Sequence, residues 1–482
     1  MTDSQSELLN SATPAAALVK GNDDAATVLR HALRYLPTRA APALFGLATA
    51  PILTRALRPD GYGRYTLLLL VASYASVVFG EWVIAGYQRF VLSGDAKERE
   101  AAEEAFAWTV FTLLTGSLVS VPFVVFSAVE VRDFLAVLAL IWGLTLFQLV
   151  ITRFVMAEDA TAATVVQLLA TALRFVVALA AALVVHSAAA VVLSAGLSLL
   201  LLSVVVLMGQ QSTRLRLRVA SLQLLASFGA FMLLTSVALN ALATVDRFLL
   251  ARLTTASVVG RYSAAYLLSE QAVLVLPSVL FLAVTPRVTA LWEQGRREEA
   301  GRLCTSIALL HLEICVPIVA ALVLYGGAIT RLAFGPAFQD ASVPPLIAIG
   351  AVFLAISTYA NLGLRMQKRT ARQAAQAVAG LAVNVLLVLV LVPPLGATGA
   401  ALATLAAYLA VAAWALVDNR FFFDCRRLFS GSLPILVPAA ALLGVHAALA
   451  PARLSAVATA AYAGLAAIRL FRGVRLSFIG AC

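Results

Sequence analysis

The amino-acid sequence predicts an all-α, multi-pass membrane protein with about 14 transmembrane helices. Of its 482 residues, 62% are hydrophobic and only 12% are charged, and the mean hydropathy is +0.95. A soluble protein of this length could not bury so many apolar side chains, because its surface needs a polar covering. The apolar residues run continuously instead of alternating, which favours helices over a membrane barrel.

Fourteen segments are long and apolar enough to cross a bilayer. A hydrocarbon core about 30 Å thick requires about 20 helical residues, because each residue rises about 1.5 Å. The segments lie at residues 35–56, 65–86, 106–127, 134–152, 161–184, 187–209, 222–245, 258–284, 303–326, 341–363, 373–393, 397–417, 433–450 and 452–471.

Lys and Arg are distributed unevenly among the connecting segments. Cytoplasmic loops collect these residues, and with the N-terminus inside, the inward segments hold 24 of them and the outward loops 9. We therefore expect both termini in the cytoplasm. The first 30 residues lack the basic start and apolar core of a signal peptide, which predicts a cytoplasmic tail. The net charge of +11 reflects this topology, and no basic patch predicts binding to nucleic acid.

Two stretches of the chain are similar: RALRPDGYGRY at Arg55–Tyr65 and RLTTASVVGRY at Arg252–Tyr262, with matched positions 197 residues apart. Each stretch joins an outgoing span to the returning one. Six spans separate the copies, so the two halves have the same orientation and form a parallel repeat. We expect the shared glycine to permit a tight reversal, and the shared Arg and Tyr to anchor at the lipid headgroups.

A weaker echo, at an offset of 210, pairs Met156 with Met366 and Arg174 with Asn384. The repeat predicts two six-helix lobes that face each other around a central cavity. The expected division is a cytoplasmic tail at 1–30, an N-lobe at 31–210 and a C-lobe at 211–420. Two additional helices and a cytoplasmic C-terminus follow at 421–482.

Two arginines lie inside predicted spans, where a charge costs at least about 2.5–3.5 kcal/mol. Arg39 lies near the cytoplasmic end of the first span, so it can either reach the inner headgroups or bind substrate phosphate in a cavity. Arg174 lies about 20 Å along the fifth span, too deep to reach a headgroup easily. We expect Arg174 to line a water-filled cavity, where a guanidinium suits phosphate oxygens.

Several carboxylates also lie inside the spans. Glu81 reaches the depth of Arg39, so these two residues form either an interhelical ion pair or a gate that opens when phosphate competes. Glu270 lies near the midplane, and Glu313 lies in the inner half of the ninth span beside His311. Each carboxylate is a candidate for coupling to H⁺ or Na⁺, and the alternative is a hydrogen bond between helices. We expect His311 to be such a partner.

No motif predicts an enzyme, a metal site or a bound cofactor. The four cysteines and four histidines lack metal-ligand spacing, and the absence of a GxxxxGK[ST] loop excludes ATP as the direct energy source. A polysaccharide polymerase or a glycosyltransferase fits poorly. The sequence has no DxD pair for a metal–nucleotide sugar and no outward loop long enough for a catalytic domain.

Four stretches resemble a known transporter family. RPDGYGRYTLLLL, after the first span, resembles the YGxY-like phrase of polysaccharide flippases, and TVDRFLLARLTTASVVGRYSAAYLLSEQ (Thr244–Gln271) is similar to the opening of their second lobe. NLGLRMQKRT and the stretch Val383–Ala410 resemble the region of their eleventh and twelfth helices. The similarity covers about residues 30–420. It is to the Wzx-type lipid-linked oligosaccharide flippases of the MATE-like multidrug/oligosaccharidyl-lipid/polysaccharide exporter superfamily.

The resemblance implies a function in the bacterial cytoplasmic membrane. Such proteins move undecaprenyl-pyrophosphate-linked glycans from the inner to the outer leaflet by alternating access, and they function with polysaccharide polymerase and chain-length proteins. Because Asp246 and Arg247 match the family phrase, the resemblance adds a functional role to the alternative of a structural pair. A MATE-like, cation-coupled antiporter for drugs or metabolites is the alternative function. Cationic drugs call for acidic cavities without nearby arginines, so Arg39 and Arg174 count against it.

Overall fold

The computed structural model describes residues 22–91, 93, 95–126, 130–157, 159–209, 216–367, 369–448 and 462. Within these ranges the secondary structure is helical, with no strand. Eleven of the described segments are helices long and apolar enough to cross a membrane. The predicted all-α, multi-pass fold is confirmed. Each of the first thirteen predicted spans falls on a helix, whereas the fourteenth, 452–471, lies outside the described residues except for Tyr462.

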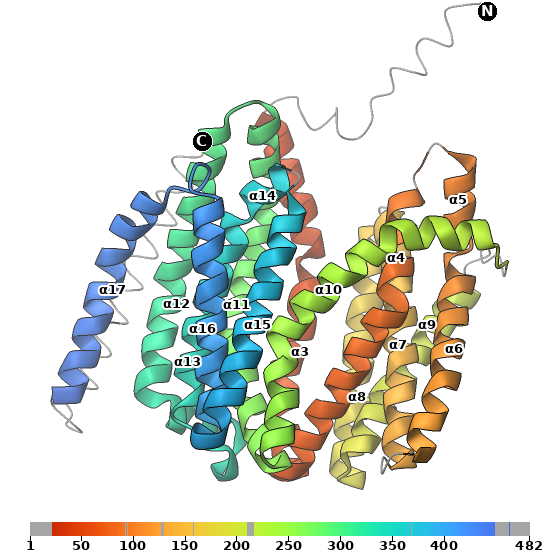
Figure 1. Ribbon diagram of the computed structural model, residues 1–482, viewed down its shortest axis with the longest axis horizontal. Helices are drawn as coiled ribbons and strands as arrows, with labels where there is room; N and C mark the ends of the chain where they lie inside the picture. The colour runs from red at the N-terminus through yellow and green to blue at the C-terminus, as the bar shows by residue number, and fades with distance from the viewer. Residues whose placement is uncertain are drawn as a thin grey trace, which may run out of the picture.

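The helices before residue 210 pack into one bundle, which we call the N-lobe. Its elements are α3 (Asn22–Ser76), the π-helix η1 (Val77–Glu81), α4 (Trp82–Phe90), α5 (Ala96–Glu103), α6 (Ala105–Phe126), α7 (Val131–Met156), α8 (Ala160–Val185) and α9 (Ala188–Met208). Helix α9 packs against α7 and α8, and α8 also packs against α3. In Figure 1 this lobe occupies the right-hand side, from orange to yellow.

The following helices form the C-lobe, to the left in Figure 1. Its elements are α10 (Val219–Leu253), α11 (Ala256–Glu293), α12 (Arg297–Phe334), the short 3-10 helix η2 (Pro336–Phe338), α13 (Val343–Ala360), α14 (Leu362–Met366), α15 (Thr370–Leu395) and α16 (Ala397–Asp418). Helix α16 packs between α13 and α15, and the additional helix α17 (Cys425–Ala448) lies along α12.

Helix α3 contains two arms that meet at Arg58. This residue has φ 59° and ψ 173°, outside the helical region, and the chain reverses there. Figure 1 shows one arm descending in dark red and the second ascending toward α4. The reversal lies at Arg58, while α10 ends at Leu253 and α11 begins at Ala256, so the turns occupy matching positions in the two halves. We call this end of the molecule the Arg58 end, and the other the α5 end.

At the Arg58 end the two lobes touch through the repeated phrase itself. A Cβ on Gly63 would lie 2.0 Å from the carbonyl oxygen of Ala256, and a Cβ on Gly260 would lie 2.0 Å from that of Pro59. Neither glycine has a positive φ, so the expected role in a tight reversal is wrong. Only glycine lets the second arm of α3 and the start of α11 approach so closely. We call this arrangement the glycine contact.

Further contacts close the same end. Tyr62 of α3 packs edge-to-face against Phe338 of the C-lobe, with ring centroids 5.9 Å apart. Arg55 donates a hydrogen bond of 3.0 Å to the carbonyl oxygen of Leu332 at the end of α12. The lobes are therefore held together at the Arg58 end by backbone, aromatic and polar contacts.

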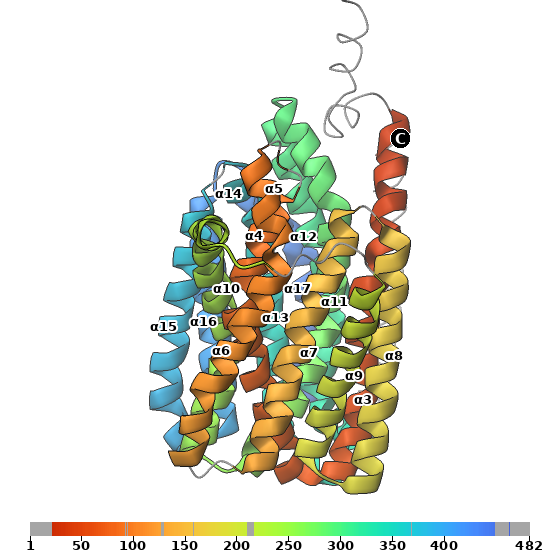
Figure 2. The same ribbon diagram turned by 90° about the vertical axis from the view of Figure 1, so that its right-hand side faces the viewer.

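A second interlobe interface runs along α10, which crosses α4 (Figures 1 and 2). Tyr74 and Thr244 share a hydrogen bond of 2.5 Å between their hydroxyl groups. Nearer the α5 end, a Cβ on Gly229 would lie 2.0 Å from the carbonyl oxygen of Trp82. Arg218 then pairs with Glu104, with 3.3 Å between Nε and Oε1. Helix α10 thus contacts the N-lobe over most of its length.

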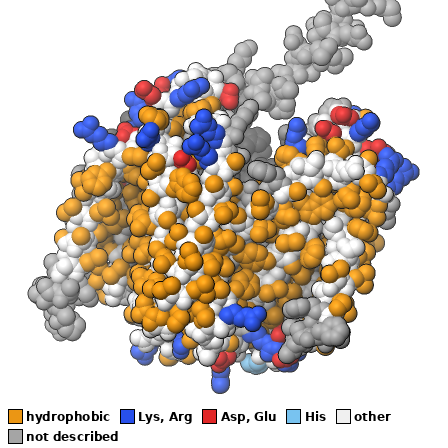
Figure 3. Space-filling model, viewed as in Figure 1, with side chains coloured by type: hydrophobic (Ala, Val, Ile, Leu, Met, Phe, Trp, Pro, Cys, Tyr) orange, Lys and Arg blue, Asp and Glu red, His pale blue; other side chains and the backbone are white. Residues whose placement is uncertain are grey.

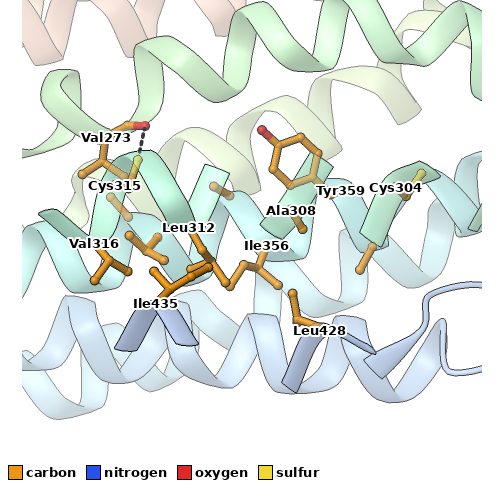
Figure 4. Packing of buried hydrophobic residues seen from close by; sticks show 14 of the residues in the cluster. Val273, Cys304, Ala308, Leu312, Cys315, Val316, Ile356, Tyr359, Leu428 and Ile435 are labelled. Atoms are coloured by element: carbon orange, nitrogen blue, oxygen red, sulfur yellow. Dashed lines mark hydrogen bonds between the residues drawn. The ribbon is translucent and has the colours of Figure 1, made fainter. Parts of the chain in front are cut away.

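The C-lobe has a dense apolar core in which small side chains let helices approach closely. Figure 4 shows part of it, where Cys315 and Val316 of α12 lie between Val273 and Ile435. The Cys315 thiol lies 3.8 Å from the carbonyl oxygen of Val273. On the outside, Figure 3 shows a broad hydrophobic band with Lys and Arg at both ends, as expected for a protein surrounded by lipid.

Candidate functional site

A cavity of about 300 Å³ lies between the lobes and brings together three of the charged residues selected from the sequence. The N-lobe helices α3, α7, α8 and α9 form most of its wall, and α10 and α11 of the C-lobe complete it. Arg174 enters from α8, Arg247 from α10 and Glu270 from α11. The sequence predicted Arg174 in a cavity, and the structure places it in one.

Arg247 is nearly buried, with 7% of its surface exposed. Its guanidinium carbon lies 3.8 Å from the centroid of the Tyr266 ring, in a cation–π contact. Nη1 donates a 3.3 Å hydrogen bond to the carbonyl oxygen of Ala243, whereas Nε has no partner among the described residues. The ring and the carbonyl hold the guanidinium in one position while part of its donor edge stays unused.

Arg174 and Glu270 are both half-buried at the cavity wall. Among the described residues, no ion pair joins Arg174 or Arg247 to a carboxylate at the cavity. The described residues of the lining include two guanidinium groups and one carboxylate, so these residues carry a net positive charge. Such a site favours an anion, and guanidinium groups match the spacing of phosphate oxygens.

The remaining wall of the cavity suits an amphiphilic ligand. Aromatic side chains from the first half line it, among them Phe45, Tyr62, Tyr65 and Phe175. Gln167 and Thr171 of α8 add polar groups on the same helix as Arg174. The amide nitrogen of Gln167 lies 3.4 Å from the Thr171 hydroxyl, one helical turn away on α8.

Asp246, next to Arg247, points into the C-lobe and forms the centre of a polar network. Tyr262 donates a 2.5 Å hydrogen bond to Oδ2 of Asp246, and Thr404 donates another of 3.1 Å to the same oxygen. Asn384 donates to Thr404 over 3.3 Å, while its own Oδ1 has no partner among the described residues. The carboxylate is 1% exposed. The network joins α10, α11, α15 and α16.

The simple pair of Asp246 and Arg247 considered from the sequence does not form through the side chains. The backbone N–H of Arg247 donates to Oδ1 of Asp246 over 2.8 Å, and the guanidinium turns instead to Tyr266. Adjacent residues on a helix point about 100° apart, so the carboxylate and the guanidinium face different surroundings. Asp246 therefore belongs to the C-lobe interior and Arg247 to the cavity.

The other selected residues lie apart from this cavity. Glu81, on the π-helix η1, accepts a 3.4 Å hydrogen bond from Ser236 of α10, which makes it an interlobe contact. Glu313 lies on α12, outside the residues that line the cavity. Arg39 is on α3, but its side chain lies outside the described part of the structure, and with it the expected pair with Glu81.

His311 is fully buried, as an interhelical partner would be. Its Nδ1 lies 3.6 Å from the thiol of Cys315 on the same helix, and Nε2 has no partner among the described residues. The expected hydrogen bond to another helix is therefore wrong within the described structure.

Sequence reasoning missed Tyr266, Thr404 and Tyr408. The hydroxyl groups of Tyr266 and Tyr408 lie 2.9 Å apart and join α11 to α16. One signal was present: Tyr266 is four residues after Tyr262 of the repeated phrase, so both tyrosines lie on the same helix face. Tyr262 itself is 0% exposed, so the headgroup anchor expected there is wrong. Thr404 gave no signal, because a threonine costs little inside a membrane helix.

A sequence model of a family described as polysaccharide biosynthesis protein matches residues 52–344, from α3 into α13 and including Arg174, Arg247 and Glu270. The chain belongs to this family. The resemblance to polysaccharide flippases, read from four stretches of the sequence, is therefore confirmed at the level of the family. No curated protein matches the chain.

The fold is shared with solved transporters. The lipid II flippase MurJ, in an inward closed conformation, matches with a TM-score of 0.72 at 13% identity, covering 92% of this chain and 99% of MurJ. A MATE family multidrug resistance transporter of the MOP superfamily is similar in its inward-facing form, with a TM-score of 0.62 at 13% identity over 79% of this chain and 94% of that one. Its outward-facing form gives 0.59 at 14% identity over 86% and 98%. At these identities the likeness establishes the fold alone.

Proposed function

We propose that this family member is a flippase. It moves undecaprenyl-pyrophosphate-linked oligosaccharide from the inner to the outer leaflet of the bacterial cytoplasmic membrane, for polysaccharide assembly. The observation that carries the proposal is the pair of guanidinium groups, Arg174 and Arg247, on one interlobe cavity and without a carboxylate ion pair among the described residues. Membership in a polysaccharide biosynthesis family and the fold shared with MurJ support it.

The two arginines come from different lobes, so one bound headgroup can contact both lobes at once. The pyrophosphate bridges Arg174 of the N-lobe and Arg247 of the C-lobe, and so draws the lobes together around the headgroup. The aromatic and amide groups of the wall contact the sugars, and the prenyl chain stays in lipid between helices. Rocking of the lobes breaks the glycine contact at the Arg58 end and exposes the cavity there.

The network around Asp246 supplies the coupling site of this proposal. Its carboxylate, the Thr404 hydroxyl and the Oδ1 of Asn384, which has no partner among the described residues, are oxygens suited to H⁺ or Na⁺. Asp246 and Arg247 are consecutive in the chain, and the backbone N–H of Arg247 donates a hydrogen bond to Asp246. Binding of the cation at Asp246 and of the substrate at Arg247 therefore involves neighbouring residues. Cation binding here would then bias the C-lobe toward one of its two positions.

The expected orientation places the α5 end in the cytoplasm, as the distribution of Lys and Arg favours. The headgroup then enters from the α5 end and leaves at the Arg58 end. We propose that a polysaccharide polymerase and chain-length proteins use the delivered glycan, and that this chain is itself a transporter and not an enzyme.

Transfer of labelled undecaprenyl-pyrophosphate oligosaccharide between the leaflets of proteoliposomes tests the proposal. Arg174→Ala removes one charge-assisted contact worth about 1.5–3 kcal/mol, so transfer falls about 10- to 100-fold. Arg174→Lys keeps the charge and retains part of the activity. Arg302→Ala, on exposed α12 surface outside the cavity, is the control and retains wild-type transfer.

Two outcomes would contradict the flippase. If the Arg174→Ala variant transfers the glycolipid as fast as the wild type at the same protein level, the cavity arginine has no role in transport. Efflux of a cationic drug that depends on Asp246 and Glu270, with no transfer of the glycolipid, would establish the antiporter instead.

A further inference from the structure

A second pocket, of about 580 Å³, opens at the α5 end of the C-lobe, away from the central cavity. It lies where three connections meet: the α11–α12 turn, the α14–α15 turn and the α16–α17 turn. Trp292, Arg297, Arg369 and Phe421 are among its lining residues, and none of the described residues that line it carries a carboxylate. The transport mechanism uses none of these residues.

The two arginines of this pocket are available to a ligand. Arg297 lies with its guanidinium carbon 4.9 Å from the centroid of the Trp292 ring, which fixes the group, and its N–H edges form no hydrogen bond with a described residue. Arg369 is exposed, and no described residue forms an ion pair with it. By contrast, the neighbouring Arg296 and Arg372 are paired with Glu299 and Asp418.

The backbone adds to the positive potential of the pocket. Helix α12 begins at Arg297, and α15 begins at Thr370, directly after Arg369. Neither helix has a side-chain hydrogen bond at its N-cap. The positive end of the α15 dipole, with no acidic side chain in its first turn, therefore lies beside Arg369, whereas Glu298 and Glu299 offset that of α12.

The rim of the pocket is apolar and faces outward. Phe421 is 91% exposed, and Phe429, near the start of α17, is 69% exposed. An apolar groove of about 530 Å³ begins at Cys425, Leu428 and Phe429 and continues along α12, α13 and α17. A charged pocket followed by an apolar groove matches an amphiphile with a phosphate head and hydrocarbon chains.

We propose that this pocket binds an anionic phospholipid of the leaflet at the α5 end. Arg297 and Arg369 hold the phosphate, Phe421 lies at the level of the glycerol backbone, and the acyl chains follow α17. An exposed phenylalanine near the end of a span inserts its apolar ring at the boundary between headgroups and acyl chains. A soluble phosphate ligand shares the head chemistry, but it would have no use for the exposed rim or the groove.

The proposal depends on the fold and on a surrounding bilayer, and not on the glycolipid substrate. Its readout is lipid retention, so it can fail while the flippase is confirmed, and the reverse also holds.

Native mass spectrometry of the purified full chain, released from detergent with equal amounts of phosphatidylglycerol and phosphatidylcholine, tests it. We expect the wild type to retain phosphatidylglycerol preferentially. The double variant Arg297→Ala/Arg369→Ala binds phosphatidylglycerol at least tenfold more weakly, whereas Arg302→Ala/Arg331→Ala, with the same loss of charge outside the pocket, binds as the wild type. Phe421→Ser, which removes an exposed ring that contacts only the Arg420 guanidinium among the ring contacts of the described residues, also weakens retention.

Three results would overturn the assignment. One is equal retention of the two lipids by the wild type, and another is undiminished phosphatidylglycerol binding by the double variant. The third is displacement of the lipid by an equal concentration of inorganic phosphate, which would show that the site takes soluble phosphate.

Discussion

The two copies of Gly-Arg-Tyr occupy equivalent places in the two lobes, but their side chains do different things. The glycines are used alike, since Gly63 and Gly260 form the same close contact from opposite sides. The arginines differ: Arg64 pairs with Glu130 and Asp133, at 2.6 and 2.7 Å, whereas Arg261 forms no ion pair with a described residue. The tyrosines differ most, because Tyr65 lines the cavity and Tyr262 is buried against Asp246.

This difference extends through the lobes. At the offset of 197, Asp246 and Arg247 correspond to Thr49 and Ala50 of the first arm, both of which line the cavity. At the offset of 210, Arg174 of the cavity corresponds to Asn384 of the polar network. Most of the cavity wall comes from the N-lobe, whereas hydroxyl and amide groups fill the corresponding interior of the C-lobe. The same backbone plan thus surrounds an open space on one side and a polar network on the other.

The largest effect is expected from the position that the two copies use alike. Gly260→Val or Gly63→Val places a branched side chain where a carbonyl oxygen lies 2.0 Å from the new Cβ, and overpacking of this kind costs about 1–3 kcal/mol or more. We expect the Arg58 end to open and transport to be lost. Ser263 is buried on the cavity wall. In a Ser263→Cys background, the glycine variants should make this cysteine react at least tenfold faster with a membrane-impermeant thiol reagent than it does with both glycines present.

Gly444→Val is the matched control, because a Cβ at this helical position of α17 would meet nothing within 4 Å. It should leave both thiol labelling and transport unchanged. Wild-type labelling and transport in the Gly63 and Gly260 variants would show that the glycine contact does not close this end.

An intermediate effect is expected from the tyrosines. Tyr262→Phe removes a buried hydrogen bond to the Asp246 carboxylate, which costs about 1–3 kcal/mol. Tyr65→Phe, whose hydroxyl has no hydrogen bond to a described residue, should change stability by less than about 0.5 kcal/mol. Thermal unfolding of the two purified variants in detergent measures the difference. Equal unfolding temperatures for the two variants would mean that the hydrogen bond from Tyr262 to Asp246 does not stabilise the fold.

The smallest effect is expected from the arginines, and it depends on pH. Arg64 and Arg132 lower the pKa of Glu130 from its ordinary value of 4.5. A lowered carboxylate pKa stabilises the fold above the unfolded value, and this contribution is lost as the pH falls through the folded value. The stability difference between wild type and Arg64→Ala should therefore be present at pH 7 and shrink below about pH 4.

Arg261→Ala is the control from the other copy, and its difference from wild type should not change with pH over the same range. Unfolding measured between pH 7 and pH 3 checks both variants. A constant difference for Arg64→Ala would show that its ion pairs do not contribute to folding.

The fold and the charged part of the site could be predicted because both depend on large transfer energies. Twenty apolar residues in a row, or one arginine deep in a span, have few alternative explanations in a membrane. Hydropathy could not reveal which face of a helix meets the cavity, so Glu313 was selected together with Glu270. The sequence did not point to Tyr266, Tyr408 and Thr404, because placing such side chains in a membrane helix costs little free energy, whether they face lipid or protein.

The wrong prediction of a tight reversal at Gly63 and Gly260 has a different cause. A glycine between predicted spans is usually explained by a turn, and the reversal does lie nearby, at Arg58. What a single sequence cannot show is that Gly63 and Gly260 meet, because the space each leaves empty is filled by the other half of the chain.

That reciprocity sets the two glycines apart from the rest of the phrase. The arginines and tyrosines are also identical in the two copies, but each makes contacts of its own. Gly63 and Gly260 depend on each other, because each leaves the room that the other's helix occupies. The part of the repeat that both halves use in the same way is therefore the part where the two halves touch.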